Sequence, residues 1–378
     1  MEKMIQRQRL RKLLQRLVDT YSPSGKEEDL LEFVRGYLKR RHLPVISQAV
    51  DENRYNLVVM PEDTDVRLAL IGHLDTVSAY DLDNYGYLEQ GDQIKGLGVA
   101  DMKGGCAAMV EAYLSLWESR TSPFPAALCL VVGEEETGDG AHQLMKSYHF
   151  PWAIIGEPTN LIPCLSSYGY VELQLASRGR RLHASLAKRQ QNAIEVMLQS
   201  ILRLTHYLQS NHPEVVCNIR DLFSTPAGFA VPERCEAWLD VHVPPTAPIG
   251  EILAAMEDIA VLRREGRHGI EIGFRTATID AGYELPEKGL VVEALKSIYE
   301  HKGLSWETRA FHSHSDANQI WAAGVKPIVL GPGQLEQAHT QDESASFEQI
   351  CTAAEIYLGI LRQMIDSGGG LDLVAQPT

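Results

Sequence analysis

The spacing of apolar residues divides the chain into segments of two kinds. Four short runs are almost continuously apolar, at residues 67–72, 126–133, 152–156 and 326–330. Strands with both faces buried have this pattern, which is typical of a parallel sheet between helices. Helical spacing beside these runs predicts helices at residues 6–19, 25–40, 103–116, 288–301, 315–323 and 347–365. The sequence therefore predicts an α/β fold in which helices cover a parallel-rich sheet.

The middle of the chain has a different pattern. Residues 170–176, 235–243 and 270–274 alternate apolar and polar positions, and residues 192–209 and 249–262 have helical spacing. Alternating strands belong to a sheet with one face open to solvent. Their order indicates a β-α-β-β-α-β unit, an α+β domain of ferredoxin-like type. We expect a discontinuous domain of residues 1–165 and 281–378 that is interrupted by this inserted domain of residues 166–280.

Composition and charge exclude several classes of protein. The chain has 35 Lys and Arg against 50 Asp and Glu, a net charge of −15. Duplex nucleic acid is bound through clustered Lys and Arg, so we expect no nucleic-acid partner. No uncharged apolar run approaches roughly 18 residues, so we expect no membrane span. The N-terminal segment lacks the apolar run of a secretory signal, and the six cysteines are widely spaced without a CxxC pair, which favours reduced thiols and a cytoplasmic location.

Side chains of the metal-ligand type follow each of the four apolar runs. Ligands bind at the carboxyl ends of parallel strands, so the residues just after each run are expected at one edge of the sheet. The residues concerned are His73 and Asp75, the triplet Glu134, Glu135 and Glu136, then Glu157 and His339, with Asp101 just before the helix at 103–116. Two histidines and several carboxylates suit zinc, cobalt or manganese. Each residue alone fits a solvated loop, but their recurrence after four strands favours a metal site.

The candidate ligands are too many for one ion. Zinc in hydrolytic sites takes about three protein ligands and a water, so five or six ligands suit two ions about 3.5 to 4 Å apart with a bridging carboxylate. Asp75 lies two residues after His73 and could orient its imidazole without being a ligand. One glutamate of the triplet would then remain as a general base. The pattern from Gly96 to Asp101 also resembles a dinucleotide-binding fingerprint, but it lacks the third glycine, so a nucleotide-dependent oxidoreductase is the weaker interpretation.

Five sequence blocks together resemble one enzyme family. They are residues 73–77 (HLDTV), 96–105 (GLGVADMKGG), 134–138 (EEETG), 156–159 (GEPT) and 338–343 (AHTQDE). In this order, across nearly the whole chain, they resemble the co-catalytic zinc amidohydrolases and exopeptidases typified by acetylornithine deacetylase and succinyl-diaminopimelate desuccinylase. The resemblance implies a zinc-peptidase-like catalytic domain that is interrupted by a smaller lid domain, through which such enzymes commonly dimerise.

The resemblance also implies a role for each residue of these blocks. It assigns one zinc ion to His73 and Glu157, the other to Glu136 and His339, and the bridge between them to Asp101. Asp75 would orient His73. The family motif contains Glu-Glu-x-Gly, so counting back from Gly138 makes Glu135 the general base, and a shift of one residue stays open.

Other segments resemble parts of the family that contact the substrate. Residues 178–184 (RGRRLHA) resemble a lid stretch whose histidine, here His183, reaches the partner subunit's site and helps to hold the developing oxyanion. Two more segments resemble the substrate pocket, and their residues are Ser315, Asp316, Asn318, Gly331 and Gly333. His312 and His314 beside the pocket could meet an anionic substrate or be ordinary loop residues.

The resemblance implies metal-dependent hydrolysis of the amide bond of a small N-acyl amino acid, as in acetylornithine deacetylase. Phe229 and His242 stand where the family often has an Asn and an Arg that anchor the substrate, which leaves the substrate open. The alternatives are a succinyl-diaminopimelate desuccinylase, a dipeptidase or carboxypeptidase, and a hydrolase that releases lysine or ornithine from a carrier protein. A relative without activity that binds metal or a partner protein is the alternative from another class.

The expected cofactors and partners follow from the same resemblance. They are two divalent ions, with zinc preferred and cobalt or manganese as alternatives, a small N-acyl amino acid or dipeptide as substrate, and a second copy of the chain bound through the lid domain.

Overall fold

The chain forms two compact units in the computed structural model, which describes residues 4–62, 64–119, 124–187, 191–226, 228–261 and 270–366. The first unit contains Met1–Ser166, Leu285–Phe311 and Ser315–Thr378, and the second contains Ser167–Glu284 and His312–His314. The divisions at 166/167 and 284/285 lie one and four residues from the boundaries expected from the sequence. The transfer of His312–His314 to the second unit was not expected.

The first unit is built on a mixed sheet whose centre is parallel, as predicted. Its strands are β1 (Val45–Ala49), β2 (Tyr55–Val59), β3 (Leu68–His73), β6 (Ala126–Val131), β7 (Trp152–Ile155), β8 (Cys164–Ser167), β16 (Arg309–Phe311) and β17 (Lys326–Val329). The order is β1-β2-β6-β3-β7-β17-β8, with β16 beside β8. The strands β6, β3, β7 and β17 run parallel, and every residue of β3, β6 and β7 is buried. The four apolar runs are therefore the buried centre of the sheet.

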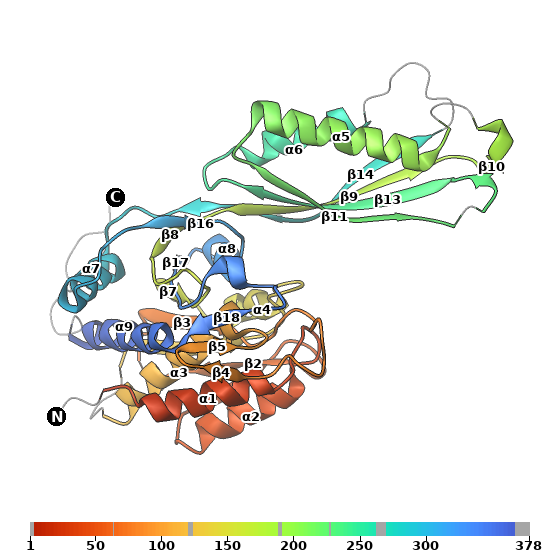
Figure 1. Ribbon diagram of the computed structural model, residues 1–378. Coiled ribbons are helices and arrows are strands. Elements are labelled where there is room, and N and C mark those ends of the chain that lie inside the picture. Colours follow the sequence, from red (N-terminus) through yellow and green to blue (C-terminus); the bar gives the residue numbers. More distant parts are fainter. Residues whose placement is uncertain are drawn as a thin grey trace. The chain divides into compact units, whose positions relative to one another are not determined.

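Helices and a small second sheet complete this unit (Figure 1). The helices are α1 (Arg7–Asp19), α2 (Glu28–Lys39), α3 (Gly104–Trp117), α4 (Asp139–Ser147), α7 (Leu290–Lys302), α8 (Asp316–Ala322) and α9 (Phe347–Asp366). Helix α3 packs against α1 and α9 and is buried from Gly104 to Leu116. The small sheet has the order β18-β5-β4, from β4 (Leu88–Gln90), β5 (Gln93–Lys95) and β18 (Ser344–Ser346). It brings the segment after His339 next to the segment before Asp101.

The second unit has the predicted β-α-β-β-α-β order. Its elements are β9 (Gly169–Arg178), α5 (Ala193–Asn211), β11 (Val216–Ser224), β13 (Arg234–Val243), α6 (Ile249–Val261) and β14 (Glu271–Asp280), together with the short strands β10 (Leu182–His183), β12 (Ala230–Val231) and β15 (Tyr283–Glu284). The main sheet is antiparallel with the order β11-β13-β9-β14. Helices α5 and α6 lie on the same face of it in Figure 1. Leu175 and Leu239 pack there against Met197 and Met256, which gives this unit a core of its own.

The predicted order includes two strands between the helices, but the residues of the first, β11, were not identified from the sequence, and its backbone explains why. The register of β11 against β13 shifts between Ile219 and Asp221. Such a bulge interrupts the alternation of inward and outward side chains on which the sequence prediction relied.

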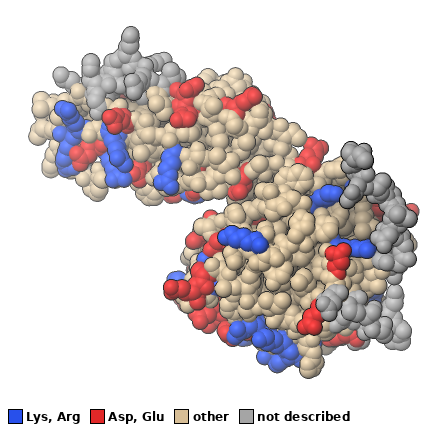
Figure 2. Space-filling view, turned by 180° about the vertical axis from the view of Figure 1, so that it is seen from behind, with Lys and Arg blue, Asp and Glu red and all other residues tan. Residues whose placement is uncertain are grey.

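The structure describes no helix that is long and apolar enough to cross a membrane. Each unit carries both acidic and basic side chains on the face in Figure 2. A location in the cytoplasm stays a prediction.

A direct backbone contact joins the start of α3 to the end of β7. A Cβ atom at Gly105 would lie 2.2 Å from the carbonyl oxygen of Gly156, the residue before Glu157. Since the neighbouring atom belongs to the backbone and not to a flexible side chain, only glycine allows this approach.

We predict that Gly105→Ala destabilises the protein by about 1 to 3 kcal/mol, because the added methyl group forces α3 away from β7. Urea unfolding with and without the substitution measures the change. Gly250→Ala is the matched control, since nothing lies within 4 Å of a Cβ at this position in α6. Equal stability of the two variants would contradict the prediction.

Candidate metal centre

Three side chains from separate parts of the chain meet at the carboxyl end of β3. His73 is the last residue of this strand, and its Nε2 lies 3.2 Å from Oδ1 of Asp101 and 3.6 Å from Oε1 of Glu157. Glu157 follows β7, the parallel neighbour of β3. All three side chains are buried. They form the first of two groups with metal-ligating atoms within 4.8 Å of one another.

The second group shares Asp101 with the first. Oδ2 of Asp101 lies 3.5 Å from Nε2 of His339, and the same nitrogen lies 2.8 Å from Oε2 of Glu135. The two oxygens of one carboxylate thus point to different histidines. This is the arrangement of a carboxylate that bridges two metal positions.

The electrostatics of the cluster favour cations. Burial raises the pKa of Glu157 well above its usual value, and the nearby charge of Asp101 raises it further. Burial opposes a charge on His73, yet the surrounding carboxylates, Glu134 first among them, raise its pKa well above the usual value. Oε1 of Glu157 makes no hydrogen bond to any described residue. A buried carboxylate oxygen that has no hydrogen-bond donor and lies beside another carboxylate fits a divalent ion.

Asp75 holds two parts of the site together. Nδ1 of His73 donates to the main-chain oxygen of Asp75 at 3.1 Å, while the Asp75 carboxylate is 3.6 Å away. The backbone, more than the side chain, therefore fixes the imidazole. The carboxylate accepts hydrogen bonds from the main-chain N–H groups of Glu134 and Glu135 and from the hydroxyl of Ser24.

The glutamate triplet is placed one residue away from the expected register. Glu135, not Glu136, lies beside His339, and the side chain of Glu136 is exposed. Glu134 lies deeper, with Oε2 3.8 Å from Nε2 of His73. This placement differs from the register obtained by counting back from Gly138, in which Glu136 is the ligand and Glu135 the base. The backbone N–H groups of Glu134 and Glu135 both donate to Asp75, which holds this part of the triplet beside the site.

Comparison with known proteins agrees with this geometry. Residues 69–363 match the profile of peptidase family M20/M25/M40. The chain belongs to this family. Membership makes it a hydrolase of the peptidase and amidohydrolase type, as the sequence blocks implied.

Two relatives and one solved structure show how far the similarity extends. An acetylornithine deacetylase of Erwinia tasmaniensis is 28% identical over 335 residues, which cover 84% of this chain and 85% of the relative. An acetylornithine deacetylase of Photorhabdus laumondii is 27% identical over 359 residues, which cover 90% of each chain. A tripeptidase from Staphylococcus aureus superposes with a TM-score of 0.81 over 96% of this chain and 100% of the other, at 21% identity. At this identity, the similarity to the tripeptidase shows a shared fold only.

The predicted pocket residues of this M20/M25/M40 chain have structural contacts of their own. Ser315 caps α8, and its hydroxyl and the side chain of Asn318 form a reciprocal capping box. Gly331 and Gly333 allow close backbone packing, because a Cβ at Gly331 would lie 2.2 Å from the oxygen of Gly156 and Gly333 has a φ of +90°. Asp316 is buried, and its charge is among the causes that raise the pKa of Glu134, after burial itself. Of the five, Asp316 is the one that acts electrostatically on the site.

The histidines of the second unit are described there by themselves. His183 is exposed on β10, with Nδ1 2.8 Å from the hydroxyl of Ser185. His312 stacks on Tyr168, and His314 stacks on Tyr170 with ring centroids 4.0 Å apart. The stacking shows why residues 312–314 belong to this unit. Sequence periodicity gave no signal for these ring contacts.

We predict that Asp75→Asn lowers kcat by about 10- to 100-fold, as is typical when a partner of metal ligands is lost. The carboxylate now accepts hydrogen bonds from two backbone N–H groups, one on each oxygen. The amide of Asn has a single oxygen, so its NH₂ group would face one of these N–H donors. Steady-state kinetics with a metal determination on the same sample tests this. Ser24→Ala removes only one of the bonds to Asp75 and should have a smaller effect. A wild-type kcat for Asp75→Asn would show that the loop of Glu134 is held by other contacts.

Proposed function

We propose that this chain is a dinuclear metal-dependent amidohydrolase that removes the acyl group from a small N-acyl amino acid. The observation that carries the proposal is the carboxylate of Asp101, which turns one oxygen to each of two groups of ligands. His73 and Glu157 would hold one ion, Glu135 and His339 the other. Zinc suits this mixture of nitrogen and oxygen ligands, and cobalt or manganese could replace it.

Bound ions at these positions would lower the pKa of a water and polarise the substrate carbonyl. The chain itself has to move the proton. Glu134 belongs to neither ligand group, lies 3.8 Å from His73 and is held through its main-chain N–H by Asp75. Its carboxylate can take the proton from the attacking water and deliver it to the leaving nitrogen, which is the role of a general base and acid. This proposal differs from the sequence-based prediction, in which Glu135 is the base.

We predict that Glu134→Gln lowers kcat by at least about 100-fold, since an amide cannot take the proton. Metal content should stay at the wild-type value because Glu134 is not a ligand. The control is Glu136→Gln, which changes the same group in the exposed neighbour and should leave kcat unchanged. Measuring kcat and bound zinc on both variants decides between the two registers. Loss of activity in Glu136→Gln alone would restore the register expected from the sequence.

The acyl group and the amino acid are proposed from relatives. Two acetylornithine deacetylases that cover most of the chain support an acetylated amino acid as substrate. Phe229 is 91% exposed, and the ring of His242 in β13 lies beside those of His314 and Tyr170. At these two positions the chain offers a phenyl ring and an imidazole in place of an amide and a guanidinium. A panel of N-acetyl and N-succinyl amino acids, dipeptides and tripeptides, tested on zinc- and cobalt-loaded protein, separates deacetylase, desuccinylase and peptidase. Absence of hydrolysis across the whole panel at full metal occupancy would favour a metal-binding relative without activity.

An exposed edge of the second unit suits a homodimer. Strand β11 is the outer strand of its sheet and carries exposed apolar side chains, Val216, Ile219, Leu222 and Phe223. Helix α5 contacts β11 and exposes Leu198 and Leu202. A long apolar edge strand is a template for pairing with another chain. We propose that two copies meet along β11 and α5 and that His183 contributes an oxyanion donor to the partner's site, with Nδ1 held by Ser185.

We predict that mixing Glu134→Gln with His183→Ala restores activity that neither variant has alone. In a mixed dimer, one site would combine an intact Glu134 with an intact His183. Random exchange should give about a quarter of the wild-type activity, because half of the dimers are mixed and one of their two equivalent sites is complete.

Size-exclusion chromatography of Leu202→Arg, with Leu88→Arg as an exposed control in the first unit, tests the interface. No recovery on mixing, despite subunit exchange, would place His183 outside the partner's site.

A further inference from the structure

One buried carboxylate accepts three main-chain hydrogen bonds from the loop of Asp101. Oε1 of Glu343 accepts from the N–H groups of Ala100 at 2.9 Å and Asp101 at 3.0 Å. Oε2 accepts from the N–H of Gly98 at 2.8 Å. Glu343 is 4% exposed, so water does not compete for these donors. Neither of the two ligand groups contains Glu343.

The same residue ties this loop to the segment of His339. Glu343 lies four residues after His339 and directly before β18. Strand β18 pairs with β5, and the N–H of Gly96 donates to the main-chain oxygen of Glu343 at 3.2 Å. Glu343 is therefore bonded through both its backbone and its side chain to the residues that lead into Asp101.

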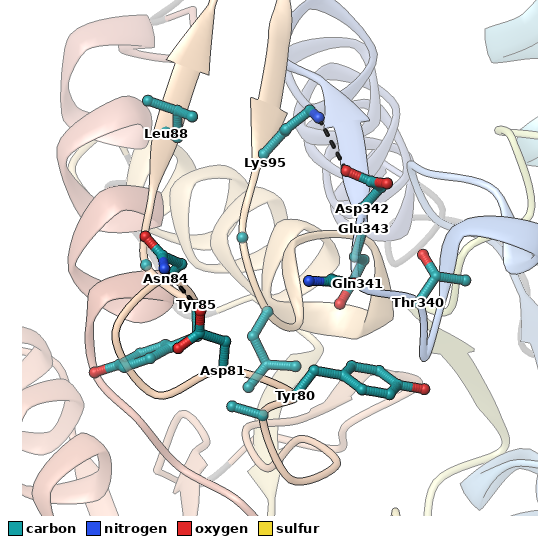
Figure 3. A pocket seen from close by; sticks show the side chains of 14 residues that line it. Tyr80, Asp81, Asn84, Tyr85, Leu88, Lys95, Thr340, Gln341, Asp342 and Glu343 are labelled. Atoms are coloured by element: carbon teal, nitrogen blue, oxygen red, sulfur yellow. Dashed lines mark hydrogen bonds and ion pairs between the residues drawn. The ribbon is translucent and has the colours of Figure 1, made fainter.

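The segment after His339 has fewer attachments on its other side. A cavity of about 360 Å³ opens there, lined by Tyr80, Tyr85, Lys95 and residues 340–343 (Figure 3). Among the described residues, two links on this side are the hydroxyl of Tyr80, which donates to the main-chain oxygen of His339 at 3.1 Å, and the ion pair of Lys95 with Asp342 at 3.2 Å. Both links involve exposed groups, and an exposed ion pair contributes little, typically about 0 to 1 kcal/mol.

The number and kind of donors require a carboxylate at this position. The three N–H groups donate to both oxygens of the Glu343 side chain. A carboxylate has two acceptor oxygens, whereas an amide has one. An amide of the same size would turn an N–H donor toward at least one backbone N–H, and a buried donor without an acceptor is costly.

We propose that Glu343 is a positioning residue that fixes the carboxylate of Asp101 and thereby sets both metal positions at once. The proposal rests on the two-metal function proposed above. Glu343 acts through Asp101 and touches no substrate. Because Asp101 is the one ligand common to both groups, an error in its position should weaken both metal ions together. Loss of a ligand that belongs to one group should weaken mainly one ion.

Zinc binding to the full-length metal-free chain tests this without any substrate. Titration against a competing chelator gives the two affinities, measured at pH 8, above the pKa of about 7 to which burial raises Glu343. We expect Glu343→Gln to weaken both binding steps by about 10- to 100-fold, the usual effect of losing a partner of the ligands. Asp342→Asn is the matched control, because it neutralises the neighbouring carboxylate but leaves the loop of Asp101 bonded, and its two affinities should be those of the wild type. Glu157→Gln serves as the comparison in which one step is weakened more than the other.

A purely structural role would give a different result. It would lower the melting temperature of the metal-free chain and leave both zinc affinities unchanged, which would overturn the proposal. A loss confined to one zinc ion would also overturn it. Glu343→Asp keeps the charge on a shorter side chain, so it provides a second variant that should fold and still weaken both steps. Kinetics adds a further readout, since excess zinc should restore kcat/KM in Glu343→Gln but not in Glu134→Gln.

The two proposals fail in different ways. A wild-type chain that binds fewer than two zinc ions would contradict the dinuclear function itself. A wild-type chain that binds two ions, together with a Glu343→Gln variant that binds them equally well, would contradict only the role of Glu343.

Discussion

The carboxylate of Asp101 is the constraint on which the site depends. Its two oxygens face His73 and His339, which come from opposite ends of the sequence. A shift of this side chain toward one histidine moves it away from the other. Its position therefore has to be fixed more tightly than that of a side chain that binds one ion. The chain does this with backbone contacts. Gly98 adopts a φ of +77° two residues before Ala100, and Gly105 packs onto the backbone of Gly156 just after the loop.

The buried carboxylates of the site are satisfied in two different ways. Asp75 and Glu343 accept hydrogen bonds from main-chain N–H groups, which offset part of the cost of burying a charge, although burial still raises the pKa of Glu343 to about 7. Glu157 lacks such donors on one oxygen, and burial raises the pKa of both Glu157 and Glu134 well above the usual value. This difference separates carboxylates that hold loops in place from carboxylates that face the metal positions or the reacting water.

The sequence predicted the parts of this arrangement that follow from strand ends. Four apolar runs became buried strands, and His73, Asp101, Glu157 and His339 lie together because parallel strands end at one edge. The register of the glutamate triplet could not be read in this way, since three consecutive carboxylates are equivalent in the sequence and two backbone bonds to Asp75 distinguish them. Strand β11 was missed because a bulge breaks its alternation. The contacts of Glu343 were also beyond sequence patterns, because they join its side chain to main-chain groups more than 240 residues away.

The net charge of −15 acquires a more specific meaning from these contacts. Glu136 belongs to the solvated surface, whereas Glu343 belongs to the buried cluster, so the acidic blocks of the sequence overlap only in part with the acidic site. In the metal-free chain the raised pKa values of Glu134 and Glu157 mean that these groups retain protons at a higher pH than free glutamate does. Ligation by cations would release protons from the cluster, so metal binding and protonation compete for the same oxygens. Repulsion among the carboxylates therefore disfavours the folded chain without metal and favours cation binding. Ions that bind the folded chain and not the unfolded chain would stabilise the fold by mass action.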